Sequence, residues 1–207
     1  MSPSGLLIPP ISLSDRRSPL RLSGVASPLP HIVAATALSA AVAPGQAAPR
    51  VWTLGALCSI VPDLDRVGSR AVVPYETMWG PHGVTHSPAF AAAQSAVLVA
   101  VAFRTRDWAS WRLGLAFYFS LAAASHGALD AMTNGGLGVG FFAPFDATRY
   151  FLPFRPIKIS PLGVRDFLPP QGVAILTNEF FWTWLPSGAV VLPAQLARRR
   201  LAAAEDG

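Results

Sequence analysis

Five apolar segments, separated by prolines, glycines and short polar stretches, dominate this chain of 207 residues. Alanine and leucine are the main residues of these segments, which favours helices over strands. The segments are Ile32–Val42, Val51–Val61, Pro88–Phe103, Leu113–Ser125 and Gly172–Ala197. Because amphipathic or apolar helices are stable only when they pack against other elements, the pattern predicts an all-α bundle of about five helices.

The composition predicts association with a membrane. The chain is 52% hydrophobic and 13% charged, about half the charged fraction of a typical soluble domain. Pro88–Phe103 and Leu113–Ser125 approach the length of a bilayer span when they are extended to Thr85 and Leu129. Several passes of the membrane are therefore expected.

The positions of the arginines predict how the helices are oriented in the membrane. The arginines lie between alternate pairs of apolar segments and after the last one, so antiparallel helices would place them on one side. The residues are Arg50, Arg104, Arg106, Arg112 and Arg198 to Arg200. Cytoplasmic loops of membrane proteins carry such an excess of arginine. The arginine-rich side is therefore predicted to face the cytoplasm.

The chain is expected to divide into a disordered extension (1–29), one helical domain (30–200) and a short tail (201–207). Residues 131–171 are rich in glycine, proline and aromatic residues and are predicted to form a long irregular region before the last helix. Cys58 is the only cysteine, which excludes an internal disulfide, and its apolar neighbours indicate a buried thiol. Nucleic-acid binding is not expected, because no basic helix carries interleaved aromatic residues.

Four short polar clusters interrupt the apolar sequence and contain all four histidines. They are P-H-I at 30–32, P-D-L-D at 62–65, P-H-G-V-T-H-S at 81–87 and H-G-A-L-D at 126–130. The first and third clusters precede helices, and the second and fourth follow them. Two antiparallel hairpins packed side by side would therefore bring every cluster to one end of the bundle, opposite the arginines. Histidine and aspartate are common zinc ligands, so this end is predicted to hold a metal site.

Each cluster also has a simpler interpretation. His126 and Asp130, four residues apart, share a helical face and could form a hydrogen-bonded pair. Asp63 and Asp65 could form a turn that stops a helix. His31 is as consistent with a helix start as with a ligand. Glu179, a carboxylate in an apolar segment, is a candidate for catalysis or for a bond to a neighbouring helix.

The order of these motifs resembles the YdjM family of membrane-bound, metal-dependent hydrolases that are regulated with the SOS response. The resemblance covers His31 to Pro161 and includes Pro144-Phe145-Asp146. The family usually has His-Arg-Gly before x-T-H-S, whereas this chain has Pro81-His82-Gly83, which leaves the role of His82 open and that of His86 intact. The resemblance implies a protein of the bacterial inner membrane with hydrolase activity. The ligand order is also similar to zinc-dependent phospholipase C and P1 nuclease, but no histidine follows His126.

We therefore expect a hydrolase with one or two divalent metal ions, most simply zinc, that activate water to attack an ester. The expected ligands are Asp65, His86, His126 and Asp130, with His31, His82 and Asp63 completing or orienting the set. Asp63 or Glu179 would act as general base. Four basic residues of the region near the site would bind a phosphoester substrate, either a lipid or a small molecule, unless they are ordinary solvated charges: Arg149, Arg155, Lys158 and Arg165.

Two other classes of protein fit the same sequence. The first is a non-enzymatic membrane protein, in which the histidines and aspartates form a structural polar network or an ion pathway. An ion pathway should place ionisable groups along the helices, whereas here they gather at one end. The second is a soluble phospholipase-like enzyme, which would extract without detergent.

Overall fold

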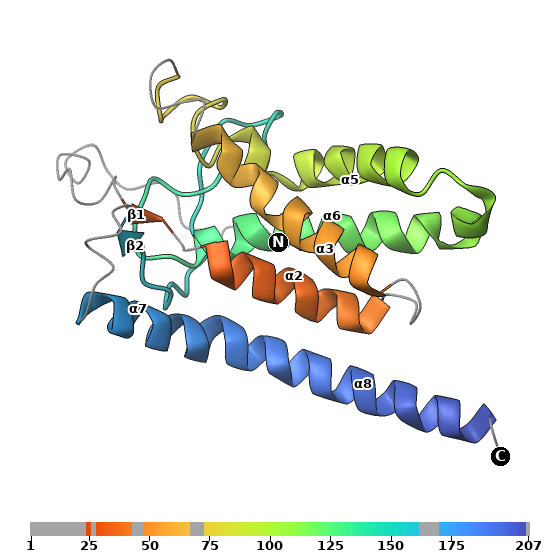
Figure 1. Ribbon diagram of the computed structural model, residues 1–207. Coiled ribbons are helices and arrows are strands. Elements are labelled where there is room, and N and C mark those ends of the chain that lie inside the picture. Colours follow the sequence, from red (N-terminus) through yellow and green to blue (C-terminus); the bar gives the residue numbers. More distant parts are fainter. Residues whose placement is uncertain (1–23, 26–27, 43–47, 67–72, 162–169, 206–207) are drawn as a thin grey trace, which may run out of the picture.

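The computed structural model describes residues 24–25, 28–42, 48–66, 73–161 and 170–205. Its helices there are α2 (Pro28–Val42), α3 (Ala48–Ile60), α5 (Pro88–Ala102), α6 (Arg112–Ala131), α7 (Gln171–Glu179) and α8 (Leu185–Glu205). The π-helical turn η7 (Phe180–Trp184) joins α7 to α8, so the last helix is continuous in Figure 1. The predicted all-α fold of about five helices is confirmed.

Helices that follow one another along the chain run in opposite directions, with α7, η7 and α8 taken as one helix (Figure 1). Figure 1 shows α2 against α3 and α5 beside α6, with α8 extending along the side of α2. The first residues of α2 and α5 and the last residues of α3 and α6 consequently lie at the same end of the bundle. We call this the site end, because the four polar clusters belong to it.

The core of the bundle is built from aromatic and small residues. Tyr118 and Phe119 of α6 are fully buried, and the Tyr118 hydroxyl donates a hydrogen bond to the backbone oxygen of Ala35 at 3.0 Å. The side chain reaches α2 by passing Gly55 of α3, where a Cβ atom would lie 1.8 Å from the Tyr118 hydroxyl oxygen. The expected burial of Cys58 is confirmed. These contacts fix α2, α3 and α6 relative to one another.

Two arginines at the end opposite the site stabilise the C-terminus of α5. Arg50 donates to the backbone oxygen of Ala102 at 2.5 Å, and Arg112 Nε donates to that of Phe103 at 3.0 Å. The last carbonyl groups of a helix lack partners within the helix, and cationic side chains satisfy them well. These two arginines therefore have a structural role in the helix cap, which the sequence interpretation assigned to membrane orientation alone.

The site end is covered by irregular chain rather than by another helix. The helix α5 starts as expected, with Ser87 Oγ accepting a hydrogen bond from the Phe90 backbone N–H at 3.1 Å and Pro88 in the first turn. Short 3₁₀ turns, η3 (Val61–Leu64) and η4 (Val84–His86), carry the polar clusters. Residues 132–161 follow α6 with two isolated β-bridges, which agrees with the long irregular region that was predicted.

The sequence also predicted an N-terminal extension and membrane-spanning helices. The expected extension 1–29 lies mostly outside the described residues; β1 (Gly24–Val25) within it pairs antiparallel with β2 (Ser160–Pro161). Among the residues that the structure describes, no helix combines the length and the apolar character needed to cross a bilayer. The expectation of several membrane-spanning helices is therefore not supported.

Candidate metal centre

All four histidines of the chain surround one carboxylate, that of Asp130 near the end of α6. Its Oδ2 lies 3.2 Å from His86 Nε2 and 3.4 Å from both His82 Nε2 and His126 Nε2. Its Oδ1 lies 3.6 Å from His31 Nε2. The side chains come from α2, from the loop before α5 and from α6. The folding of the chain thus brings together residues that are up to 99 positions apart in the sequence, as the spacing of the polar clusters predicted.

Four of the gathered residues could hold a metal ion. One ligand atom from each of Asp63, His86, His126 and Asp130 lies within 4.8 Å of the other three. The two histidines and Asp130 are buried, and the Asp63 side chain is 20% exposed. We call these four residues the metal group. Two imidazoles and two carboxylates form a ligand set that suits zinc and other divalent ions.

Buried polar atoms of the metal group that lack hydrogen-bond partners within the described residues are consistent with a bound cation. These atoms are Asp63 Oδ1, His86 Nε2, His126 Nε2 and both carboxylate oxygens of Asp130. Buried polar atoms are normally satisfied, so a cluster of exceptions that faces one point calls for an explanation. A shared cation would satisfy all of them.

The opposite nitrogens of the two histidines are held by neighbouring groups. His126 Nδ1 lies 2.6 Å from the backbone oxygen of Ser59, so Nδ1 carries a proton and Nε2 is the nitrogen that faces the metal group. His86 Nδ1 lies 3.0 Å from Thr85 Oγ1 and 3.3 Å from Asp65 Oδ2. Metal-binding histidines characteristically use their second nitrogen in this way, which fixes the tautomer and the ring orientation.

Asp65 and Asp63 have exchanged the places that were expected for them. Asp65 Oδ2 accepts hydrogen bonds from the His82 backbone N–H at 3.1 Å and from Thr85 Oγ1 at 2.6 Å. Its carboxylate therefore orients His86 from outside the metal group, and Asp63 stands in the group instead. The physical reason is that Asp63 lies in the 3₁₀ turn η3 and Asp65 directly follows it in a helical conformation, so the two side chains do not point the same way as they would in an extended chain.

His31 lies directly against the metal group without belonging to it. Its ring stacks on that of His126 with centroids 3.7 Å apart and an angle of 21° between the planes. Within the described structure neither of its ring nitrogens has a hydrogen-bond partner. His31 is fully buried, so it is part of the site and not only the start of α2.

His82 occupies a strained backbone position at the edge of the site. Its φ angle of 60° is in the left-handed region, which is uncommon for residues other than glycine. Its Nδ1 lies 3.2 Å from the Tyr75 hydroxyl, and its Nε2 contacts the guanidinium of Arg66. Both nitrogens thus face other side chains, and His82 is outside the metal group.

The charges of the site perturb one another strongly. Burial disfavours a charged His126, but Asp130 and Asp63 outweigh it and raise the pKa of His126 to about 10. Burial, together with the neighbouring His126, lowers the pKa of His31 to about 3. For Asp130, the attraction of His82 and His126 overcomes the effect of burial and holds its pKa well below the ordinary value. Interaction with His126 likewise outweighs burial at Asp63 and lowers its pKa to about 2. The carboxylates are therefore ionised, as metal ligands must be.

Glu179, the other carboxylate expected to take part in catalysis, lies at the end of α7. Its side chain is fully buried, but it is not a member of the metal group. Its proposed role as a general base remains a prediction.

Arg149 lies beside the site, and its expected role in substrate binding remains a prediction. Its guanidinium is buried and donates to the backbone oxygens of Pro81 at 2.5 Å, Tyr75 at 2.6 Å and Thr77 at 2.9 Å. These bonds hold the loop that carries His82 in place. Since backbone oxygens accept from both of its terminal nitrogens, Arg149 has a structural role at the site. A solvated charge, the alternative considered from the sequence, is excluded by its burial.

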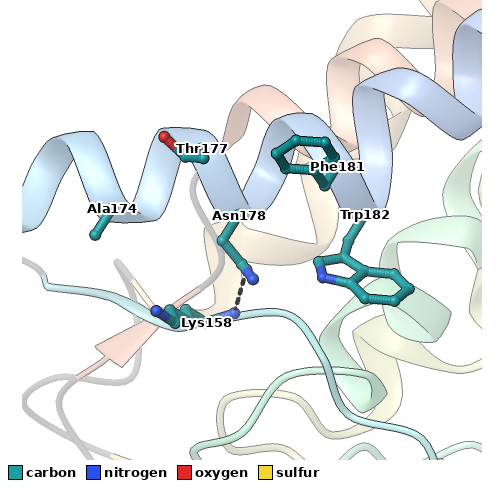
Figure 2. Close-up of a pocket in the computed structure, with 6 residues that line it drawn as sticks. All are labelled: Lys158, Ala174, Thr177, Asn178, Phe181 and Trp182. Carbon is teal, nitrogen blue, oxygen red and sulfur yellow. Dashed lines mark hydrogen bonds between the residues drawn. The ribbon is translucent and has the colours of Figure 1, made fainter.

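Two other basic residues that were expected to bind phosphate contact other parts of the described structure. Arg155 stacks on the Phe151 ring, with its guanidinium carbon 4.7 Å from the ring centroid. Lys158 lies at an open pocket of about 460 Å³ beside α7, shown in Figure 2. The backbone N–H of Lys158 donates to Asn178 Oδ1 at 2.8 Å. Arg165 is outside the described residues.

Sequence reasoning did not identify Tyr75, Ser59 or Arg66 as parts of the site. Tyr75 lies in a loop without periodic pattern, and Ser59 contributes only a backbone oxygen, which no motif encodes. Arg66 had a signal, because it follows P-D-L-D directly and lies three residues after Asp63. That spacing allows the ion pair seen between Arg66 Nε and Asp63 Oδ1 at 3.6 Å.

Fold and site together define an all-α protein with a buried histidine–aspartate group able to hold a metal ion. Residues 27–201 match the model of the YdjM inner membrane protein family. The chain therefore belongs to that family. The inner membrane protein YbcI of Escherichia coli (strain K12) is 32% identical over 155 residues, covering 73% of this chain and 86% of the relative. No solved structure gives a significant match. The expected family is confirmed.

Proposed function

We propose that this protein is a hydrolase of the bacterial inner membrane that uses a divalent metal ion, zinc in the simplest case, to cleave an ester. The metal group would hold the ion through His86 Nε2, His126 Nε2 and the carboxylates of Asp63 and Asp130. The observation that carries the proposal is the convergence of these unpartnered buried atoms within 4.8 Å of one another. When bound, such an ion lowers the pKa of water from about 15.7 towards 7 and polarises the scissile bond.

The surrounding residues would keep the site ready for this chemistry. Asp65 and the backbone oxygen of Ser59 hold the two imidazoles in the tautomer that leaves Nε2 free. Asp63 is the most exposed of the four members, so its carboxylate is the one that can take a proton from water. Glu179 is the alternative base. The ordering of the histidine rings before substrate arrives reduces the reorganisation that the reaction needs.

Metal content of the full-length protein, purified in detergent, tests the proposal. We expect a stoichiometric divalent metal in the wild type and its loss in His126→Gln and Asp130→Asn, which change the ligands with little change of volume. Asp107→Asn, an exposed acid in η5 (Arg106–Trp111) at the other end of the bundle, is the matched control and should keep the metal. A metal-free wild type, or variants of the metal group that keep their metal, would contradict the proposal.

A structural polar network is the second candidate. The contacts of 3.2–3.6 Å between Asp130 and the four histidines favour it, since they hold the helix ends together even without a cation. The two candidates differ in their response to a chelator. For a metal site, removal of metal should lower the melting temperature of the wild type; for a polar network alone, a chelator should leave it unchanged.

A further inference from the structure

Arg66 is a cation held at the edge of the metal group. Its Nε lies 3.6 Å from Asp63 Oδ1, and a terminal nitrogen of its guanidinium contacts His82 Nε2. Arg66 therefore connects a member of the metal group to the histidine just outside it. Among the residues that the structure describes, none of the basic residues expected to bind phosphate occupies this position.

Solvent reaches the metal group beside this arginine. The side chains of His86, His126 and Asp130 are at most 1% exposed, whereas those of Asp63 and Arg66 are 20% and 16% exposed. Within the described structure, Asp63 and Arg66 are therefore the side chains at this edge of the group that a substrate would meet from solvent. Any charged group next to its scissile bond would meet the guanidinium of Arg66.

The guanidinium is held in place by a chain of contacts. Because Arg66 can only donate, His82 Nε2 accepts from it, and Nδ1 of the same ring faces the Tyr75 hydroxyl at 3.2 Å. The left-handed backbone of His82 and the hydrogen bond from its N–H to Asp65 place the ring for this contact. The strain at His82 thus has an explanation in the placement of Arg66.

We propose that Arg66 binds the phosphoryl oxygens of an anionic ester, which makes phosphate esters the substrate class; this rests on the hydrolase function proposed above. A guanidinium has five N–H donors and binds phosphate oxygens in pairs. The described structure gives Arg66 two contacts, so donors remain for a ligand. The charge of Arg66 would also offset the repulsion between an anionic ester and the carboxylates of Asp63, Asp65 and Asp130.

Binding of inorganic phosphate to the full-length protein in detergent, measured by titration calorimetry with and without Zn²⁺, gives a test that needs no turnover. Arg66→Gln should weaken phosphate binding about tenfold or more, and Arg66→Lys should weaken it less because it keeps the charge but loses the paired donors. Arg104→Gln, an exposed arginine at the far end of the bundle, should bind as the wild type does. Equal affinity in all four proteins would overturn the proposal.

Hydrolysis distinguishes this inference from the proposed function itself. With Zn²⁺, Arg66→Gln should lower kcat/KM for bis(4-nitrophenyl) phosphate at least tenfold and change that for neutral 4-nitrophenyl acetate less than twofold. Equal losses on both esters would count against a role in anion binding. The same comparison of wild type and Arg66→Gln with dispersed phosphatidylcholine distinguishes a lipid substrate from a soluble phosphodiester. If the wild type hydrolyses nothing yet binds phosphate through Arg66, the hydrolase proposal fails and the anion site stands.

Discussion

At the scale of single residues, the chemistry of this protein depends on which of two aspartates faces the histidines. Both carboxylates of P-D-L-D could be predicted from the sequence as site residues, because they stand among the few acids of the chain. Their roles could not, since an extended segment and a 3₁₀ turn direct residues two apart differently. The structure has the turn, and only Asp63 enters the metal group.

The first prediction concerns Asp65. The carboxylate of Asp65 contacts His86 Nδ1 and accepts a hydrogen bond from Thr85. Asp65→Asn should therefore weaken metal affinity about 10–100-fold but leave the metal stoichiometry at saturation unchanged. Asp63→Asn removes a ligand atom instead and should lower the stoichiometry. Titration of the metal-free protein with Zn²⁺ measures both quantities. Loss of stoichiometry in Asp65→Asn, with none in Asp63→Asn, would return Asp65 to the expected ligand role.

A second prediction is the pH dependence of stability when metal is removed by a chelator. The folded pKa of His126 is raised to about 10, so the stability it contributes is complete below about pH 6.5 and is lost as the pH rises towards 10. The folded pKa of His31 is lowered to about 3, so stability is also lost as the pH falls from 6.5 towards 3. Stability should therefore peak near neutral pH.

Chemical denaturation in EDTA across this pH range measures the loss of stability on the acidic and on the alkaline side, each with a slope of up to about 1.4 kcal/mol per pH unit per group. His126→Gln should reduce the loss on the alkaline side, and His31→Gln should reduce part of the loss on the acidic side. Losses that are unchanged in both variants would show that these imidazoles do not titrate as their surroundings require.

At the scale of elements, the close approach of η4 to α6 places His86 beside His126. A Cβ atom at Gly127 would lie 2.4 Å from the backbone oxygen of His86, so only glycine allows the two elements to meet. Gly127→Ala should therefore displace His86, lower stability by about 1–3 kcal/mol and reduce metal binding.

Gly114 is the matched control on the same helix. A Cβ atom there meets nothing within 4 Å, and alanine is the better helix former, so Gly114→Ala should raise stability by about 0.5–1 kcal/mol and keep the metal. Denaturant unfolding and metal content decide the comparison. A Gly127→Ala protein with wild-type metal content would mean that the contact between η4 and α6 does not position His86.

The helices themselves could be predicted from the sequence because apolar runs and proline stops are local signals. The observed α5 starts with Ser87 and Pro88, as expected from helix capping. The loops could not be predicted in the same way. Arg149 bonds to three backbone oxygens of residues 75–81, and such contacts between distant irregular segments leave no periodic trace.

At the scale of the whole molecule, the alternation of helix directions explains why polar clusters far apart in sequence meet at one end. The same alternation groups Arg50 and Arg112 at the other end, where they cap α5. The asymmetry of charge was therefore predicted correctly, but part of its cause is helix capping. A sequence pattern of arginines does not separate the two causes, because both place cations after helix ends.

The outer face of α5 and α6 gives the last prediction. Its exposed apolar side chains include Val97, Val101, Leu113 and Phe117, each more than 60% exposed. Exposed apolar side chains of this size are costly in water, and in a family of inner membrane proteins we expect lipid to cover them. We expect the wild type to stay in the membrane pellet on carbonate extraction. Leu113→Lys with Phe117→Lys should release a measurable fraction, because each lysine raises the cost of contact with lipid, whereas Ala109→Lys in η5 should not. Extraction of the wild type without detergent would instead favour the phospholipase-like soluble enzyme.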